Sequence, residues 1–160
     1  MLATITAVVV AATMTTTPTA DTPWRVDRPD RGTHGSVVRE AAVIPLKWKP
    51  FAKCVAFRES GVTNLNNRQS REDARNKSSS AAGRWQMLRA WQRGGSFMVR
   101  DRLVQFGMPK QDARQVRLTL SDTPIHEWDG WLQDVLFNEA IARGGWRHWS
   151  GGKGCNSLVP

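Results

Sequence analysis

The sequence predicts a mainly helical fold, and three observations support this prediction. In residues 123–142, apolar side chains recur at intervals of three and four, which is the spacing of one helix face, with Thr123 as the cap and Pro124 in the first turn. Residues 50–60 begin with a proline and are followed by Gly61, the usual start and end signals of a helix. Alternation of polar and apolar residues, which would indicate strands, is confined to a short region near Gly83.

Length, composition and charge limit the class of protein. The 160 residues suffice for one domain with an extension, and 40% apolar and 23% charged residues are typical of neither a disordered nor a membrane protein. The net charge of +9 favours an anionic partner, such as nucleic acid, anionic lipid or an anionic cell wall. The lysines and arginines are scattered and never form a run of five, so we expect no nucleic-acid partner, although a basic nucleic-acid binder stays an alternative.

The first 45 residues are predicted to lie outside the main domain. Residues 1–20 begin with a small, apolar segment that is too short to span a bilayer, and they resemble a secretory signal without its usual basic start. Residues 21–45 are rich in Pro, Asp and Arg and are predicted to form a linker, within which the apolar residues 37–44 pack on the core. We expect no stable membrane span, and we place the main domain at residues 46–160.

The predicted helix at residues 50–60 presents two different faces. Phe51 and Val55 share an apolar stripe, and Glu59 continues it. Cys54 lies about 140° around the helix from Glu59. The sulfur and the carboxylate therefore point to different sides, so that one can be tied to the protein frame while the other faces a cleft.

The middle of the chain has weaker signals. Residues 62–80 are polar and are predicted to form a long loop or short strands. Residues 88–93 are predicted to form a helical turn that ends at Gly94 and Gly95, and Ser96 is a candidate cap for a separate helix that ends at Gly107. Residues 110–120 are either a basic helix or an irregular segment.

The two cysteines, Cys54 and Cys155, fit no zinc-binding spacing, and the three histidines form no H-E-x-x-H motif. We therefore predict no metal and no cofactor. The cysteines are either two buried thiols or a disulfide, and the export-like start of the chain favours the disulfide. Such a disulfide would close a loop of about 100 residues and stabilise the fold by roughly 4–5 kcal/mol.

Glu59 is the main candidate for chemistry, although a glutamate at a helix end is ordinarily a solvated surface group. The negative end of the helix dipole and burial on the apolar stripe both disfavour an ionised carboxylate. A protonated carboxyl group is what general-acid cleavage of a glycosidic bond requires. The segment that follows contains Asn64, Trp85 and Trp91, which are residue types that bind sugars; the alternative role of both tryptophans is core packing.

The order and spacing of several motifs resemble those of the lysozyme superfamily over about residues 46–157. Three motifs carry the resemblance: Cys54-x4-Glu59-Ser60, Gly83-x-x-Gln86, and Trp146-x-x-Trp149 followed by Cys155. Among them, the spacing from the cysteine to the glutamate and the pair of tryptophans before a late cysteine are similar to those of animal-type lysozymes. Glu59-Ser60-Gly61, residues 83–95 with Trp91, and residues 142–146 are closer to resuscitation-promoting factors. Residues 79–86 are similar to lytic transglycosylases.

This resemblance implies a fold and an activity. The fold would be a helical domain with a small β-hairpin region at residues 62–87 beside the catalytic cleft. Glu59 would be the general acid, Ser60 and Gln86 would shape the cleft, and Trp85 and Trp91 would stack on sugar rings. The protein would cleave the β-1,4 bond between MurNAc and GlcNAc in peptidoglycan, as a monomer that is secreted or otherwise outside the cytoplasm, or that is phage-encoded and acts on the cell wall.

One position departs from the family pattern. Animal-type lysozymes have an aspartate two residues before the glycine of G-x-x-Q, where this chain has Ala81, so the nucleophile of a retaining hydrolase is missing there. Either Glu72 or Asp73 holds a water for inverting hydrolysis, or Glu59 acts alone and the substrate's own 6-hydroxyl completes the reaction. We favour the single glutamate. A catalytically inactive, lysozyme-like module that binds cell wall is the alternative of a different class.

Overall fold

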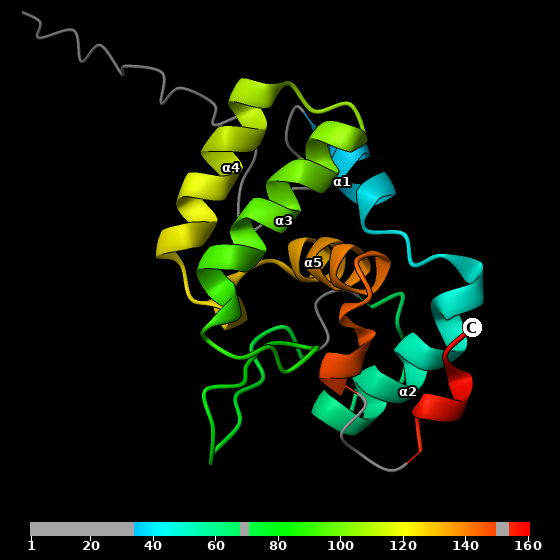
Figure 1. Cartoon of the computed structure of the whole chain (residues 1–160). Coiled ribbons are helices and arrows are strands. Elements are labelled where there is room, and N and C mark those ends of the chain that lie inside the picture. The colour runs from blue at the N-terminus through cyan, green and yellow to red at the C-terminus, as the bar shows by residue number, and fades with distance from the viewer. Residues whose placement is uncertain (1–33, 68–70, 150–153) are drawn as a thin grey trace, which may run out of the picture.

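The computed structural model describes residues 34–67, 71–149 and 154–160. Within these ranges the chain is mainly helical, as predicted, with five α-helices (Figure 1): α1 (Gly35–Ala41), α2 (Lys49–Ser60), α3 (Trp91–Gln105), α4 (Lys110–Asp122) and α5 (Gly130–Ala142). Short 3-10 helices occupy Leu46–Trp48, Ile125–Glu127, Gly145–Trp149 and Asn156–Leu158. The predicted export segment, residues 1–20, and the first part of the predicted linker lie outside the described residues.

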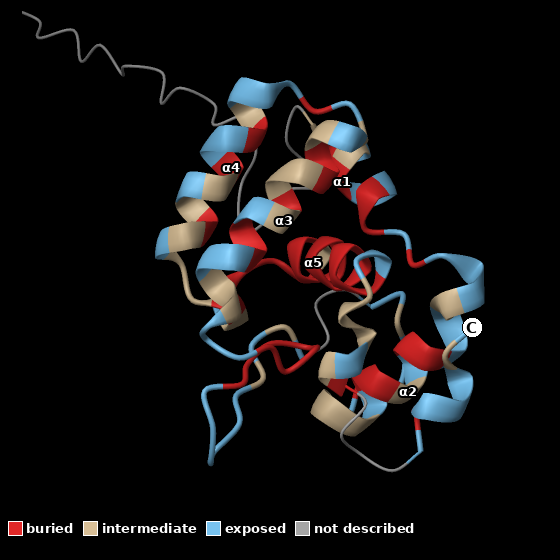
Figure 2. Cartoon of the chain, viewed as in Figure 1, coloured by how far each residue is buried: buried red, intermediate tan, exposed pale blue. Residues whose placement is uncertain are grey.

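Helix α5 lies at the centre of the fold. Residues 132–141 are all buried, so nearly the whole helix is red in Figure 2. Helices α1 and α3 and the 3-10 helix at Gly145–Trp149 pack around it. Because α5 is enclosed on all sides, it buries polar side chains as well as the predicted apolar face, and each polar side chain needs a partner from a surrounding element.

The start of α5 differs from the prediction. Thr123 is extended and its hydroxyl donates to the Thr119 carbonyl at the end of α4, so it caps no helix. Pro124 precedes only the short 3-10 helix. The N-cap of α5 is Asp129, whose carboxylate accepts a hydrogen bond of 2.8 Å from the Trp131 amide. Aspartate is at least as good an N-cap as threonine, and here it lies next to Gly130, the first residue of α5, which is buried.

Helix α3 also differs from the prediction, because it runs without a break through Gly94 and Gly95. A Cβ atom on Gly95 would lie 3.0 Å from both methyl carbons of Leu136. This glycine therefore allows α3 to approach α5 closely rather than ending a helix. Ser96 is inside the helix instead of capping one, and its hydroxyl donates to the Arg93 carbonyl at 2.8 Å.

Helix α1 brings part of the predicted linker into the folded unit. Val38 and Ala41 are fully buried, which agrees with the expectation that residues 37–44 pack on the core. The Asn138 side-chain amide of α5 donates to the carbonyls of Ala41 and Val43, at 3.1 and 3.0 Å. The core therefore begins before residue 46.

The region of the predicted β-hairpin contains no strand among the described residues. It has two isolated antiparallel bridges, between Arg75 and Ala82 and between Ala82 and Met87. Gln86 adopts a left-handed conformation (φ +48°) inside the tight turn that the bridge between Ala82 and Met87 closes. The Asn76 side chain accepts hydrogen bonds from the following backbone amides, which competes with strand pairing.

A buried ion pair attaches this region to α5. Arg84 and Asp134 have fully buried side chains, and Arg84 Nε lies 3.2 Å from Asp134 Oδ1. The same carboxylate oxygen accepts a hydrogen bond of 2.9 Å from the Trp85 indole. The Arg84 guanidinium also donates to the carbonyls of Asn67 and Leu65. The buried Arg84 side chain thus connects Asp134 of α5 to the backbone at Leu65 and Asn67.

Asp134→Ala is expected to lower the free energy of unfolding by about 3–5 kcal/mol, because it leaves the buried Arg84 charge and the Trp85 indole without their carboxylate. Urea unfolding followed by circular dichroism measures this loss. Asp73→Ala is the matched control: Asp73 is exposed, and its removal is expected to change stability by no more than about 0.5 kcal/mol. Equal stability of the two variants would contradict this account of the ion pair.

Candidate active site

The end of α2 positions Glu59. Gly61 has a φ of +74°, and its amide bonds to the Phe57 carbonyl at 2.8 Å, while the Val62 amide bonds to the Ala56 carbonyl at 3.2 Å. The bond from Gly61 to Phe57 is that of a left-handed C-cap, which glycine allows because it adopts a positive φ without strain. The predicted limits of this helix are confirmed, and Glu59 lies in its last turn.

The opposite side of α2 is covalently anchored. Cys54 and Cys155 form a disulfide with a Cα–Cα distance of 5.7 Å, which confirms the favoured prediction for the two cysteines. Phe51 and Val55, on the apolar stripe, are fully buried. The helix that carries Glu59 is therefore fixed both by its core face and by a link to the C-terminal segment.

The Glu59 carboxylate is held by one oxygen. Its Oε1 accepts hydrogen bonds from Nε and Nη2 of Arg58, at 2.9 and 2.6 Å, and Arg58 Nη2 also donates to the Trp149 carbonyl at 2.5 Å. No described residue donates to Oε2. The Glu59 side chain is 26% exposed, so it is less buried than its apolar stripe predicts. The Arg58 guanidinium thus contacts both the Glu59 carboxylate and the backbone of the C-terminal segment.

His148 lies near this carboxylate, and Trp91 contacts His148. Burial lowers the pKa of His148, and the Glu59 charge acts in the opposite direction on that pKa, which places the two groups within electrostatic reach. The His148 ring is 4.9 Å from the Trp91 ring and 5.1 Å from the Trp149 ring, between centroids. We call Glu59, Arg58, His148 and Trp91 the Glu59 site. His148 was not among the predicted site residues; its position inside the Trp146-x-x-Trp149 motif was the available signal.

Trp85 does not belong to the Glu59 site. It is 1% exposed, it stacks on Phe137 with a centroid distance of 3.7 Å, and its indole nitrogen donates to Asp134. From this position it cannot stack on a sugar ring, so the core-packing alternative applies. Trp91 is only half-buried at the start of α3 and stays a candidate for contact with a ligand.

Ser60 and Gln86 hold the backbone near Glu59. The Ser60 hydroxyl lies 2.7 Å from the Arg84 carbonyl, and so links the end of α2 to the turn at residues 83–86. The Gln86 side-chain amide donates to the Gly83 carbonyl at 2.9 Å inside that turn. Asn64 is exposed, and its side chain accepts a hydrogen bond from the Asn66 amide. These contacts fix the shape of the surrounding backbone.

The two candidate second carboxylates have different surroundings. Glu72 Oε2 accepts a hydrogen bond of 2.8 Å from the Gly130 amide at the start of α5. Burial raises the pKa of Glu72, and the bond from Gly130 opposes this shift. Glu72 thus has a structural partner at the start of α5. Asp73 is exposed to solvent.

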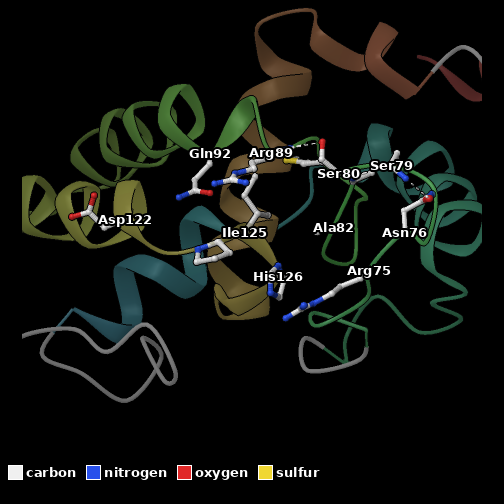
Figure 3. A pocket seen from close by; sticks show the side chains of 13 residues that line it. Arg75, Asn76, Ser79, Ser80, Ala82, Arg89, Gln92, Asp122, Ile125 and His126 are labelled. Atoms are coloured by element: carbon white, nitrogen blue, oxygen red, sulfur yellow. Dashed lines mark hydrogen bonds between the residues drawn. The ribbon is translucent and has the colours of Figure 1, made fainter.

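A cavity of about 450 Å³ with a mixed polar and apolar lining borders the first turn of α3 (Figure 3). Arg75, Arg89 and His126 line it, together with Gln92 of α3. Glu59 does not line this cavity. Trp91, which precedes Gln92, contacts His148 instead, so the first turn of α3 borders both the cavity and the Glu59 site. Ala81 also lines the cavity.

Comparison of the chain with family models, curated proteins and solved structures found no match. Within the described ranges, no group of three or more His, Cys, Asp and Glu side chains is placed to hold a metal ion. The helices in the same ranges are all too short or too polar to cross a membrane.

The depressed pKa of His148 predicts a pH effect on stability. Because burial disfavours its charged form, the unfolded chain takes up a proton more readily than the folded protein as the pH falls below the ordinary value of 6.5. Stability is therefore expected to fall with pH in this range, and His148→Gln should remove that part of the loss. Urea unfolding at neutral pH and at about pH 5 tests this. The same pH dependence in both proteins would contradict it.

Proposed function

We propose that this protein cleaves the glycan strands of peptidoglycan between MurNAc and GlcNAc, with Glu59 as the single general acid and base. The observation that carries the proposal is the state of the Glu59 carboxylate: Arg58 holds Oε1, whereas Oε2 has no donor among the described residues. A carboxylate with one fixed oxygen and one open oxygen is suited to exchange a proton with a bound ligand. The half-buried rings of Trp91 and His148 supply flat surfaces for a sugar beside it.

In the proposed reaction, Oε2 of Glu59 donates its proton to the oxygen that links the two sugars, and the bond between this oxygen and C1 of MurNAc breaks. Glu59, now ionised, takes a proton from the 6-hydroxyl of the same MurNAc. The oxygen of that hydroxyl forms the new bond to C1. The product is a 1,6-anhydro sugar, no water is consumed, and Glu59 ends in the protonation state in which it began.

The hydrogen bond that Glu72 already makes supports this scheme over a two-carboxylate hydrolysis. Inverting glycosidases keep their two carboxyl groups roughly 6.5–9.5 Å apart, with a water between them. Glu72 is bound to the Gly130 amide, and Ala81 supplies no acid. Arg58 has a positioning role, because it orients the Glu59 carboxylate through two hydrogen bonds and is itself held by the Trp149 carbonyl.

The net charge of +9 fits an anionic substrate such as the cell wall. Purified peptidoglycan tests the proposal: we expect the protein to release soluble muropeptides, measured by chromatography of the supernatant. Sedimentation with the wall without any released sugar would instead identify a catalytically inactive binding module. Binding to duplex nucleic acid that weakens steeply with salt, with no affinity for the wall, would identify a nucleic-acid binder.

A further inference from the structure

A basic groove lies between α3 and α4, which run side by side in Figure 1. Its volume is about 460 Å³, and seven residues line it: Phe97, Arg100, Asp101 and Val104 from α3, and Lys110, Arg114 and Arg117 from α4. Four cations and one anion give these lining residues a formal charge of +3 (4 − 1). None of them belongs to the Glu59 site. We call this feature the α3–α4 groove.

An aromatic ring organises two of the cations. Phe97 is 39% exposed, and the guanidinium carbons of Arg100 and Arg117 lie 5.0 and 4.6 Å from the centre of its ring. Such cation–π contacts restrict the motion of the two guanidinium groups before a ligand arrives. Less ordering is then needed on binding, which favours affinity.

The α4 cations carry no countercharge from the described residues. Lys110, Arg114 and Arg117 make no ion pair with any described residue, whereas Arg100 pairs with Asp101 through an Nε–Oδ1 contact of 2.8 Å. Their spacing of four and three residues places the α4 cations along one face of the helix, over about 10 Å. Because these like charges repel one another, an anionic ligand that spans them would relieve the repulsion.

We infer that the α3–α4 groove binds a flexible, single-stranded polymer of phosphodiesters joined by small polyols, such as a glycerol phosphate chain. Guanidinium groups bind phosphate oxygens through paired N–H groups, and a row of cations can contact successive phosphates. Single-stranded nucleic acid is less suited, because its bases need an open aromatic face, and the Phe97 ring already contacts two guanidinium groups. This inference goes beyond the proposed function and does not depend on Glu59.

A salt titration with a defined glycerol phosphate oligomer tests the inference. Arg114→Gln combined with Arg117→Gln is expected to weaken binding at least about tenfold and to reduce the slope of log affinity against log salt by about 1.4. Lys47→Gln combined with Lys53→Gln is the matched control, since it removes the same charge from exposed positions near and on α2. Phe97→Leu keeps an apolar side chain but loses the cation–π contacts, and we expect it to bind about two- to fivefold more weakly.

Thermal unfolding of each variant establishes that it is folded, and Glu59→Gln is expected to bind the oligomer as the wild type does. Binding by the α4 double variant that equals that of the Lys47/Lys53 control would overturn the inference. Tighter binding of a single-stranded nucleic acid with the same number of phosphates, at the same salt concentration, would also overturn it. Cleavage of a short, phosphate-free glycan of MurNAc and GlcNAc by the α4 double variant should match the wild type, so failure of the groove and failure of Glu59 catalysis are distinguishable.

Discussion

Glu59→Gln is expected to slow the release of muropeptides from peptidoglycan by about a hundredfold to ten-thousandfold, the range that general acid–base catalysis contributes. Glutamine has nearly the same shape and can still accept the Arg58 hydrogen bonds, but it cannot donate the proton that the leaving oxygen needs. The initial rate of release, measured at equal concentrations of the two proteins, gives this ratio. Equal thermal unfolding temperatures would show that the loss is chemical and not structural.

Two other carboxylates provide matched controls for this prediction. Glu72→Gln can still accept the Gly130 hydrogen bond, and Asp73→Asn alters an exposed side chain, so both variants should fold and release muropeptides at the wild-type rate. If either variant were as slow as Glu59→Gln, a second carboxylate would take part in the reaction, and the single-glutamate mechanism would be wrong.

Replacement of both cysteines by serine is expected to lower the free energy of unfolding by roughly 4–5 kcal/mol, because the Cys54–Cys155 disulfide joins positions separated by 101 residues. This link restricts the unfolded chain and fixes the C-terminal segment to the helix that carries Glu59. Urea unfolding with and without reductant measures the effect. The double serine variant should not respond to reductant, and a loss below about 1 kcal/mol in the reduced wild type would contradict the prediction.

Features that depend on neighbouring residues could be predicted from the sequence. The limits of α2 follow from Pro50 at its start and from the positive φ of Gly61 at its end, and both signals act within one helical turn. The helical character of residues 123–142 was recognised, but not the start of α5, because Asp129 and Thr123 are both acceptable caps. Which of these two residues caps the helix depends on which segment packs in the core.

Features that depend on distant contacts could not be predicted. In the sequence, Gly95 is typical of a helix end, whereas in the structure it lies inside α3 and Leu136 packs against it. In the sequence, Trp85 is a candidate sugar-binding residue, whereas in the structure its contacts with Asp134 and Phe137 place it in the core. The same holds at the candidate site, where the 3-10 helix at Gly145–Trp149 brings His148 near Glu59 from the far end of the chain.

The most direct test of the single-glutamate mechanism is the mass of the products that form in water labelled with heavy oxygen. If Glu59 acts alone, the released muropeptides will end in 1,6-anhydro MurNAc, will be lighter by one water than hydrolysed fragments, and will contain no label. Reducing ends that carry the heavy oxygen would show that water completes the reaction, and would contradict the mechanism proposed for Glu59.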